Sequence, residues 1–198
     1  RKSIDPNYKN GRRPVSLNRS ELIGDIPDTV ENRDFQLKTL IKILYKTPVT
    51  QIYTNDCEAD DIIAYLCKTK KSDFEKIIVT SDKDYYQLMD EKTKIWSPNK
   101  RILIDSQYVL DKWKIMSENF CLARCFAGDQ SDGLKGVKGA GFKVMVKRFP
   151  ELGVCNNLSI NDIVIKSKEQ IKNGSKLKVF KEIVESEQDL IKNWKLMY

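Results

Sequence analysis

Residues 76–84 read Lys-Ile-Ile-Val-Thr-Ser-Asp-Lys-Asp. The apolar run at 77–79 is typical of a central strand in a parallel sheet, which is buried on both faces. Asp82 and Asp84 follow at the carboxyl end of this strand, where open α/β sheets bind their ligands. The stretch therefore predicts an α/β fold with an acidic site at one edge of the sheet.

Helical and strand patterns alternate on both sides of this stretch. Apolar residues recur at helical spacing in two segments before it, and short apolar runs follow it. The predicted strands are 49–53, 77–79, 93–96 and 101–104, and the predicted helices among them are 29–46, 58–70 and 85–89. Alternation of this kind indicates a sheet with crossover connections.

No further strand is expected after residue 106. The predicted helices there are 106–113, 117–127, 141–149, 159–172, 175–186 and a last one near the C-terminus. The change near residue 115 predicts a domain boundary, with an α/β domain at 1–115 and an all-helical domain at 116–198.

The composition excludes several function classes. The 198 residues include no histidine, which removes Ser-His-Asp and Cys-His catalysis and His-ligated zinc. The apolar runs are too short for a membrane span, so no membrane partner is expected. Five cysteines without a Cys-x-x-Cys pair indicate reduced thiols in a cytoplasmic setting, with Cys121 and Cys125 as small buried residues. Hydrolytic chemistry here must use carboxylates, lysines or metal-bound water.

The net charge of +7 is unevenly distributed along the chain. Residues 1–20 and residues 133–150 each carry a local charge of +5, and the acidic residues gather between them. Basic segments around an acidic centre suit a polyanion held beside a cation site, and nucleic acid is the obvious polyanion. Each basic segment taken alone could equally be a solvated surface.

Three acidic clusters occur at the expected ends of elements. They are Glu58, Asp60 and Asp61 at a helix start, Asp82 and Asp84 after a strand, and Asp129 and Asp132 in a turn-rich loop. Carboxylates gathered in one place raise one another's pKa, and a divalent cation removes that cost. Oxygen ligands without histidine favour Mg²⁺ or Mn²⁺, and two such ions can drive phosphodiester hydrolysis. The alternative is that each cluster merely forms a turn or a helix N-terminus.

Glycines at 136, 139 and 141 lie between two predicted helices. Their spacing allows a tight turn whose backbone N–H groups, beside a helix N-terminus, bind phosphate without reading bases. Lys138 and Lys143 would add positive charge to this hairpin. The alternative is a flexible connector.

Four motifs in this order resemble the 5′-nuclease family. They are the Glu-Ala-Asp-Asp of 58–61, the Thr-Ser-Asp-Lys-Asp of 80–84, the Gly-Asp-Gln-Ser-Asp of 128–132 and the glycine hairpin at 136–141. The family includes phage 5′–3′ exonucleases, phage-type RNase H, polymerase-associated 5′-nuclease domains and flap endonucleases. The resemblance covers roughly residues 1–150.

The resemblance implies a PIN-like parallel-sheet α/β domain at 1–115 with part of a helical arch. An all-helical region of the helix-hairpin-helix (H3TH) type would follow at 116–198. It implies hydrolysis with two Mg²⁺ or Mn²⁺ ions, and a K⁺ ion at the helix-hairpin-helix. The implied substrates are DNA flaps, nicks and 5′ ends, or RNA–DNA hybrids, and the implied partners are replication proteins.

The resemblance also assigns roles to single residues. The metal ligands would be Glu58, Asp60, Asp61, Asp82, Asp84, Asp129 and Asp132. Tyr8, Lys9 and Arg12 match the family's Tyr-Lys-x-x-Arg element. Lys9 and Arg12 would then polarise the scissile phosphate. The DNA-binding residues would be Tyr8, Arg13, Gly136, Lys138, Gly139, Gly141 and Lys143.

One departure from the family pattern concerns the N-terminus. The family opens with a buried strand ending in a metal-binding Asp, and a further strand carries a second Asp before the arch, but neither precedes Arg1. We therefore expect a fragment, or half of a split nuclease completed by a partner chain. Two other hypotheses stay open: a DNA-structure-binding module without activity, and a PIN-type ribonuclease.

Overall fold

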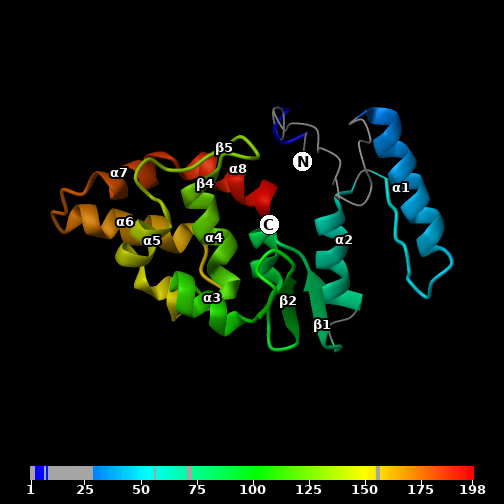
Figure 1. Ribbon diagram of the computed structural model, residues 1–198. Helices are drawn as coiled ribbons and strands as arrows, with labels where there is room; N and C mark the ends of the chain where they lie inside the picture. The colour runs from blue at the N-terminus through cyan, green and yellow to red at the C-terminus, as the bar shows by residue number, and fades with distance from the viewer. Residues whose placement is uncertain (1–2, 7, 9–28, 56, 71–72, 155–156) are drawn as a thin grey trace. The chain divides into compact units, whose positions relative to one another are not determined.

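The computed structural model describes residues 3–6, 8, 29–55, 57–70, 73–154 and 157–198 (Figure 1). The chain forms two units, which we call the larger unit (Arg1–Gly11 with Ala59–Tyr198) and the smaller unit (Arg12–Glu58). No helix in the described ranges is long and apolar enough to cross a membrane. A domain boundary was expected near residue 115, and the larger unit contains residues from both sides of that position. The boundary stays a prediction.

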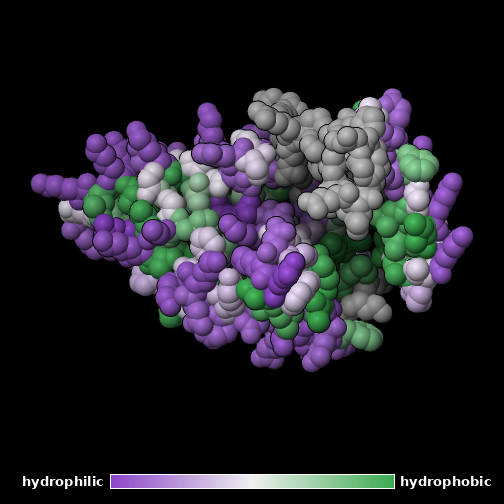
Figure 2. All heavy atoms as spheres, viewed as in Figure 1, coloured by the Kyte–Doolittle hydropathy of each residue, from purple (hydrophilic) through white to green (hydrophobic). Residues whose placement is uncertain are grey.

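The smaller unit contains the helix α1 (Val30–Leu44), which confirms the helix predicted at 29–46. Thr29 caps it, because its Oγ1 accepts a hydrogen bond of 3.2 Å from the backbone N–H of Asn32. Hydrophobic side chains of α1, including Phe35 and Leu37, are exposed. Green, hydrophobic atoms are visible on the surface of this helix in Figure 2. The strand predicted at 49–53 is wrong, because these residues are irregular and the smaller unit has no described strand to pair with them.

The larger unit contains a three-stranded sheet in the order β1 (Lys76–Val79), β2 (Thr93–Ser97) and β3 (Ile102–Ile104). The β1–β2 pair is parallel and the β2–β3 pair is antiparallel. The sheet, predicted to be parallel, is therefore mixed. Only four residues separate β2 from β3, which suffices for a hairpin but not for a crossover connection.

The prediction that the 77–79 strand is buried on both faces is also wrong. Ile78 is buried in the core, whereas Ile77 and Val79 are 62% and 68% exposed. Ile77 and Val79 are two positions apart and share one face of β1, and their exposure shows that no layer is packed over this face. Continuous apolar sequence therefore did not indicate burial here.

One short helix precedes this sheet, and another lies between its first two strands. α2 (Ala59–Tyr65) continues into a π-helical turn, η1 (Leu66–Lys70), and confirms the helix predicted at 58–70. The 3₁₀ helix η2 (Lys83–Leu88) begins two residues before the helix predicted at 85–89. It begins early because Asp82 caps it, accepting a hydrogen bond of 3.0 Å from the backbone N–H of Asp84.

Among the described residues after 106, seven helices complete the larger unit and confirm the helical region predicted there. They are α3 (Ser106–Trp113), α4 (Ser117–Ala127), α5 (Phe142–Arg148), η3 (Pro150–Gly153), α6 (Ile160–Lys172), α7 (Lys178–Glu185) and α8 (Glu187–Met197). α4 is the central one: eight of its eleven residues are buried, and it packs against η2, α5 and α8 (Figure 1). One hydrophobic core thus contains residues of the sheet and of the helices.

The expectation that strands end at residue 106 is wrong. A small antiparallel hairpin, β4 (Gly128–Asp129) and β5 (Leu134–Lys135), follows α4 directly. Its turn contains Gly133 with φ of +75°, a left-handed conformation that glycine adopts without strain. Strands of two residues carry too few side chains to produce a recognisable sequence pattern.

The glycines of the predicted phosphate-binding hairpin have different structural roles. A Cβ on Gly136 would lie 2.3 Å from the carbonyl carbon and oxygen of Ala127, so this glycine allows two backbone segments to meet. Gly139 has φ of +80° and makes a turn. Gly141 precedes α5 with φ of −62°, and a Cβ there would meet nothing within 4 Å.

We expect Gly136→Ala to destabilise the larger unit by about 3 kcal/mol, because the added methyl group would overlap backbone atoms that cannot move aside. Gly141→Ala is the matched control and should change the free energy of unfolding by less than about 1 kcal/mol. Urea unfolding followed by circular dichroism measures both. Equal effects of the two substitutions would contradict the assigned role of Gly136.

Candidate active site

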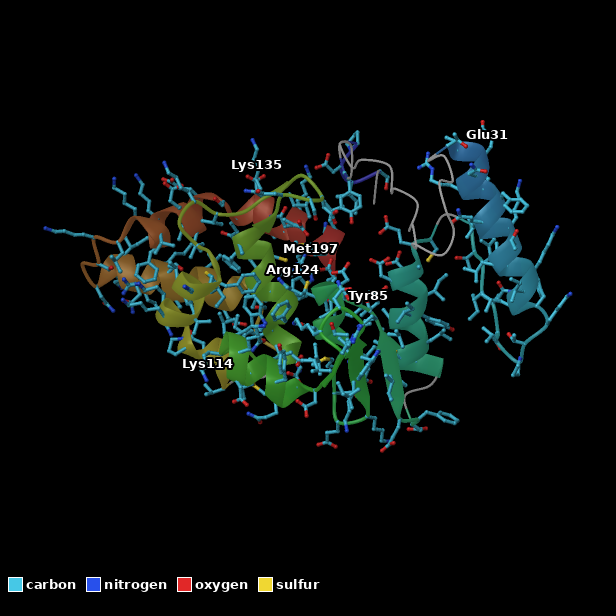
Figure 3. All side chains as sticks on the ribbon, viewed as in Figure 1. Glu31, Tyr85, Lys114, Arg124, Lys135 and Met197 are labelled. Atoms are coloured by element: carbon cyan, nitrogen blue, oxygen red, sulfur yellow. The ribbon has the colours of Figure 1, made fainter. Side chains whose placement is uncertain are left out.

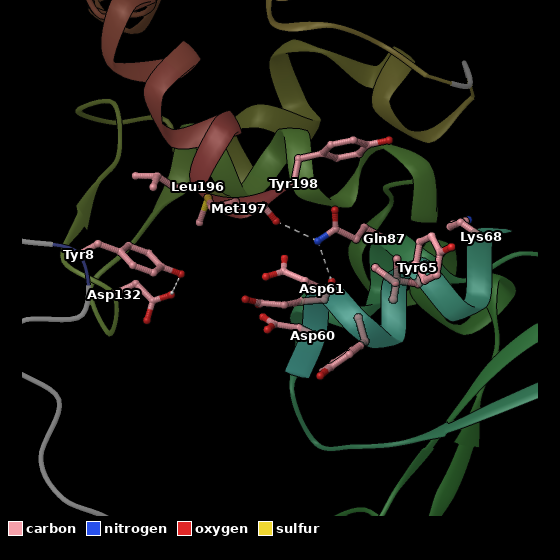
Figure 4. Close-up of a pocket in the computed structure, with 14 residues that line it drawn as sticks. Tyr8, Asp60, Asp61, Tyr65, Lys68, Gln87, Asp132, Leu196, Met197 and Tyr198 are labelled. Carbon is pink, nitrogen blue, oxygen red and sulfur yellow. Dashed lines mark hydrogen bonds between the residues drawn. The ribbon is translucent and has the colours of Figure 1, made fainter. Parts of the chain in front are cut away.

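A pocket of about 410 Å³ opens in the larger unit between α2, η2, the turn after β4 and the end of α8 (Figure 4). Its acidic lining residues come from three segments that are far apart in the sequence. They are Asp60, Asp61, Asp84 and Asp132. Four of the seven predicted metal ligands therefore share one pocket.

α2 provides Asp60 and Asp61 from its first turn. Both are half-buried, and Figure 4 shows their carboxylates facing the open space across which Asp132 lies. The amino end of a helix carries partial positive charge, which stabilises acidic side chains in this position. Glu58, the third member of this predicted cluster, belongs to the smaller unit, and its role as a ligand stays a prediction.

η2 provides Asp84, while Asp82 caps the same helix and is exposed. Gln87 fixes this segment in place, because its side-chain amide donates to the carbonyl oxygens of Asp84, at 3.0 Å, and of Met197, at 3.1 Å. The end of α8 is thereby tied to the acidic helix, and Leu196, Met197 and Tyr198 line the pocket (Figure 4).

The turn after β4 holds Asp129 and Asp132 in two different environments. Asp129 Oδ1 accepts hydrogen bonds from the backbone N–H and the hydroxyl of Ser131, at 2.8 Å and 2.6 Å. Asp132 is buried, and its Oδ2 accepts a hydrogen bond of 3.3 Å from the hydroxyl of Tyr8. Each carboxylate is thus oriented by a neighbouring hydroxyl group.

Arg124 lies between two of the carboxylates. Its guanidinium group forms ion pairs with Asp84 and with Asp129, and its side chain is only 15% exposed. It projects from α4 toward η2, the helix that carries Tyr85 (Figure 3). The sequence analysis missed this residue. The available signal was the one basic residue of this helix, which lies in its apolar second half five positions before Asp129.

The electrostatics of the pocket reflect this crowding of acidic groups. Burial raises the pKa of Asp84 to about 7, the neighbouring Asp82 and Asp129 add to the rise, and Arg124 opposes it. Burial and the carboxylates around it raise the pKa of Tyr85 to about 12. Burial acts to raise the pKa of Asp129 as well, but the hydrogen bonds from Ser131 and the guanidinium of Arg124 lower it below its usual 3.8.

The donor chemistry of the pocket fits a hard divalent cation. Its acidic residues supply only oxygen donors, which such a cation prefers. Oδ1 of Asp84 is also buried, and it forms an ion pair with Arg124 but no hydrogen bond of good geometry. Among the described residues, however, no three Asp, Glu or Cys side chains lie close enough together to hold one ion. The ligands are thus gathered in the pocket but are not arranged as a finished metal cage.

The other predicted site residues have mixed outcomes. Lys9, Arg12 and Arg13 lie outside the described residues. Tyr8, whose contact with DNA stays a prediction, is 3% exposed and donates a hydrogen bond to Asp132. Lys138 and Lys143 are exposed and make no ion pair within the described part of the chain. Cys121 and Cys125 are buried free thiols, as predicted.

Metal-free protein should lose stability as the pH rises from 5 to 8. Asp84 has a folded-state pKa near 7 against an ordinary 3.8, so the folded state binds its proton more tightly than the unfolded state in this range. We expect a decrease of about 2 kcal/mol in the free energy of unfolding, since partial exposure reduces the full linkage value. Asp84→Asn should abolish most of this decrease, as measured by urea unfolding in EDTA.

Asp162→Asn provides the control for this pH dependence. Hydrogen bonds within its capping box with Ser159 lower the pKa of Asp162 below 3.8, so this group is ionised at both pH values. The control variant should therefore keep the wild-type pH dependence. A wild-type protein that is equally stable at pH 5 and pH 8 would contradict the prediction.

Solved structures with the same fold come from bacteriophage T5. A T5 5′-exonuclease with bound divalent metal ions (zinc) matches with a TM-score of 0.72 and 23% identity, covering 99% of this chain and 68% of that one. A T5 flap endonuclease in a pseudo-enzyme-product complex with DNA and metal ions matches with the same TM-score, identity and coverage. This likeness confirms the predicted α/β fold with a helical portion.

Similar sequences are found in bacterial enzymes. The thermostable DNA polymerase I of Thermus thermophilus is 32% identical over 155 residues, which are 78% of this chain and 17% of the polymerase. The flap endonuclease Xni of Psychromonas ingrahamii is 29% identical over 181 residues, which are 88% of this chain and 64% of that enzyme. The chain therefore spans less than two thirds of the length of either relative.

Residues 1–114 match the family described as 5′-3′ exonuclease, N-terminal resolvase-like domain. These residues include α2 and η2, and thus three of the four acidic residues of the pocket. The matched range contains the first two of the four motifs that carry the resemblance, those at 58–61 and 80–84, and the chain belongs to the 5′-3′ exonuclease family.

Proposed function

We propose that this chain is a metal-dependent, structure-specific 5′-nuclease that hydrolyses phosphodiester bonds at the 5′ ends or flaps of DNA. The observation that carries the proposal is the pocket in which Asp60, Asp61, Asp84 and Asp132 converge from three distant segments. The relatives support the reaction class, because they include a flap endonuclease and DNA polymerases I.

Divalent cations bound by these carboxylates would supply charge neutralisation at the scissile phosphate and activation of water. The residues around them hold the ligands in position. The Tyr8 hydroxyl orients Asp132, the amide of Gln87 fixes the backbone of Asp84, and the helical turn of α2 presents Asp60 and Asp61. Mg²⁺ or Mn²⁺ suits this set of oxygen donors.

The glycine hairpin and α5 provide the proposed contact with the DNA backbone. Lys135, Lys138, Lys143 and Lys147 are exposed there, and none of them forms an ion pair with another described residue. Unpaired cations on one segment attract phosphate groups without regard to base sequence. A K⁺ ion at this hairpin is part of the same proposal.

Further roles follow from the family resemblance and remain proposals. Lys9 and Arg12 would polarise the scissile phosphate, Arg13 would bind DNA, and Glu58 would complete the first metal site. The substrate would arise in replication, as a DNA flap or an RNA primer on DNA, in the cytoplasm of a bacterium or of a phage-infected cell. Replication proteins, or a chain that completes the sheet, would be the partners.

Asp61→Asn and Asp132→Asn should each reduce cleavage of a 5′-labelled flapped duplex by at least ~100-fold, because each removes a charged oxygen ligand from the pocket. The assay uses Mg²⁺, with EDTA as the metal-free control. Asp111→Asn is the matched control, since Asp111 is exposed on α3 and lies outside the pocket. Wild-type turnover in both pocket variants would contradict the proposal.

A second candidate function is DNA-structure binding without cleavage. It is favoured by the absence of a three-ligand metal cage among the described residues. Metal-independent, salt-sensitive binding of the flapped duplex without release of short products would establish it. Short 5′ products that form only with metal would exclude it.

Both functions need the proposed DNA contact of the glycine hairpin and α5, and this contact can be tested separately from cleavage. The double variant Lys138→Ala, Lys143→Ala should weaken binding of duplex DNA and reduce the salt slope by about 2, because two phosphate contacts are lost. The matched control is Lys178→Ala with Lys181→Ala, two exposed lysines of α7. Fluorescence anisotropy at several salt concentrations measures the slope. An equal loss in both double variants would point to net charge rather than to the hairpin.

A further inference from the structure

The ion pairs of Arg124 connect two carboxylates that are separated by 45 positions in the sequence. One end of its guanidinium group contacts Asp84 on η2, and the other contacts Asp129 at the start of the β4–β5 hairpin. All three side chains are substantially buried, with exposed fractions of 15%, 31% and 13% for Arg124, Asp84 and Asp129. A buried, planar group with several N–H donors can hold two carboxylates at once, whereas a lysine ammonium is a single point charge.

The two carboxylates depend on Arg124 to different degrees. Asp129 has a second set of partners, because Ser131 donates two hydrogen bonds to its other oxygen. Asp84 Oδ1 is buried and has the Arg124 ion pair without a well-formed hydrogen bond. Without a cation at this position, two buried negative charges would repel each other at considerable cost.

The backbone of Arg124 is held in place by its neighbours in α4. The adjacent Cys125 and Phe126 are fully buried, and the Asn193 side chain of α8 donates to the carbonyl oxygen of Cys125, at 3.2 Å. The side-chain amide of Asn193 also donates to the carbonyl oxygen of Lys135 on β5, at 2.9 Å. This residue therefore ties the β4–β5 hairpin to α4 and α8. Any displacement of the guanidinium group must therefore come from rotation of its long side chain.

We propose that Arg124 is the internal counter-cation of the metal-free pocket, and that divalent cations bind to Asp84 and Asp129 only by displacing its guanidinium group. The inference rests on the proposed metal dependence, and it explains why the described carboxylates do not form a three-ligand cage. Arg124 then has two effects: it stabilises the metal-free protein and it weakens metal binding. Its position makes it a residue that tunes metal affinity rather than one that touches substrate.

Arg124→Met tests both effects, because methionine keeps an unbranched apolar chain and removes the charge. At pH 8 in EDTA, the variant should melt roughly 5–10 °C below the wild type, since Asp84 and Asp129 are left without their cation. Its dissociation constant for Mn²⁺, measured by electron paramagnetic resonance without DNA, should be at least roughly tenfold lower. Mn²⁺ should also raise its melting temperature more than it raises that of the wild type.

Two further variants keep the test decisive. Lys181→Met removes the same charge from an exposed position on α7 and should leave both quantities at the wild-type value. Arg124→Lys retains one charge that can reach only one carboxylate, so its melting temperature and Mn²⁺ affinity should lie between those of the wild type and Arg124→Met. If Arg124→Met does not fold, the comparison of Arg124→Lys with the wild type provides the test.

The outcomes separate this inference from the proposed function. Wild-type protein that binds Mn²⁺ as tightly as the Arg124 variants, or more tightly, overturns the displacement and leaves the metal-dependent function intact. Wild-type protein and variants that all fail to bind Mn²⁺ overturn both. An unchanged melting temperature of Arg124→Met in EDTA overturns the counter-cation role whatever the metal does.

Discussion

Like charges in a confined space are the constraint on which the rest of this structure depends. Asp60, Asp61, Asp84 and Asp132 line one pocket, and Asp82 and Asp129 lie close enough to Asp84 to raise its pKa. Such a group of carboxylates is tolerated only if protons, hydrogen bonds or cations compensate for the repulsion. The protein uses all three: a raised pKa at Asp84, hydroxyl donors at Asp129 and Asp132, and the guanidinium of Arg124.

α4 is the scaffold that allows this arrangement. Its apolar side chains fill the core between η2, α5 and α8, and Arg124, near its end, faces the acidic residues. The hairpin follows without a linker, because Gly128 and Gly136 let the two backbones meet. Asp129 and Asp132 are therefore positioned by the packing of a buried helix, because the β4–β5 hairpin that carries them continues directly from α4.

Helices whose formation depends on residues within one or two turns were well predicted from the sequence. The helices at 106–113 and 117–127 agree with α3 and α4 residue for residue, because apolar periodicity and boundary residues act within one turn. The sequence-based predictions were wrong where the structure of a segment depends on which other segment packs or pairs with it. The described part of the smaller unit offers no strand to pair with residues 49–53, and β3 runs antiparallel to β2 because their connection is short. Ile77 and Val79 of β1 are exposed because no layer covers the face that they share.

The sequence alone determined the types and order of the acidic residues, the absence of histidine chemistry, and the family. These properties depend on residue identity and spacing, which need no coordinates. Tertiary structure alone decided that Arg124 pairs with Asp84 and Asp129, that Tyr8 contacts Asp132 across 124 positions, and that Gly136 serves backbone packing. Each of these is a contact between distant segments, and such contacts follow from how helices pack in three dimensions rather than from any local pattern.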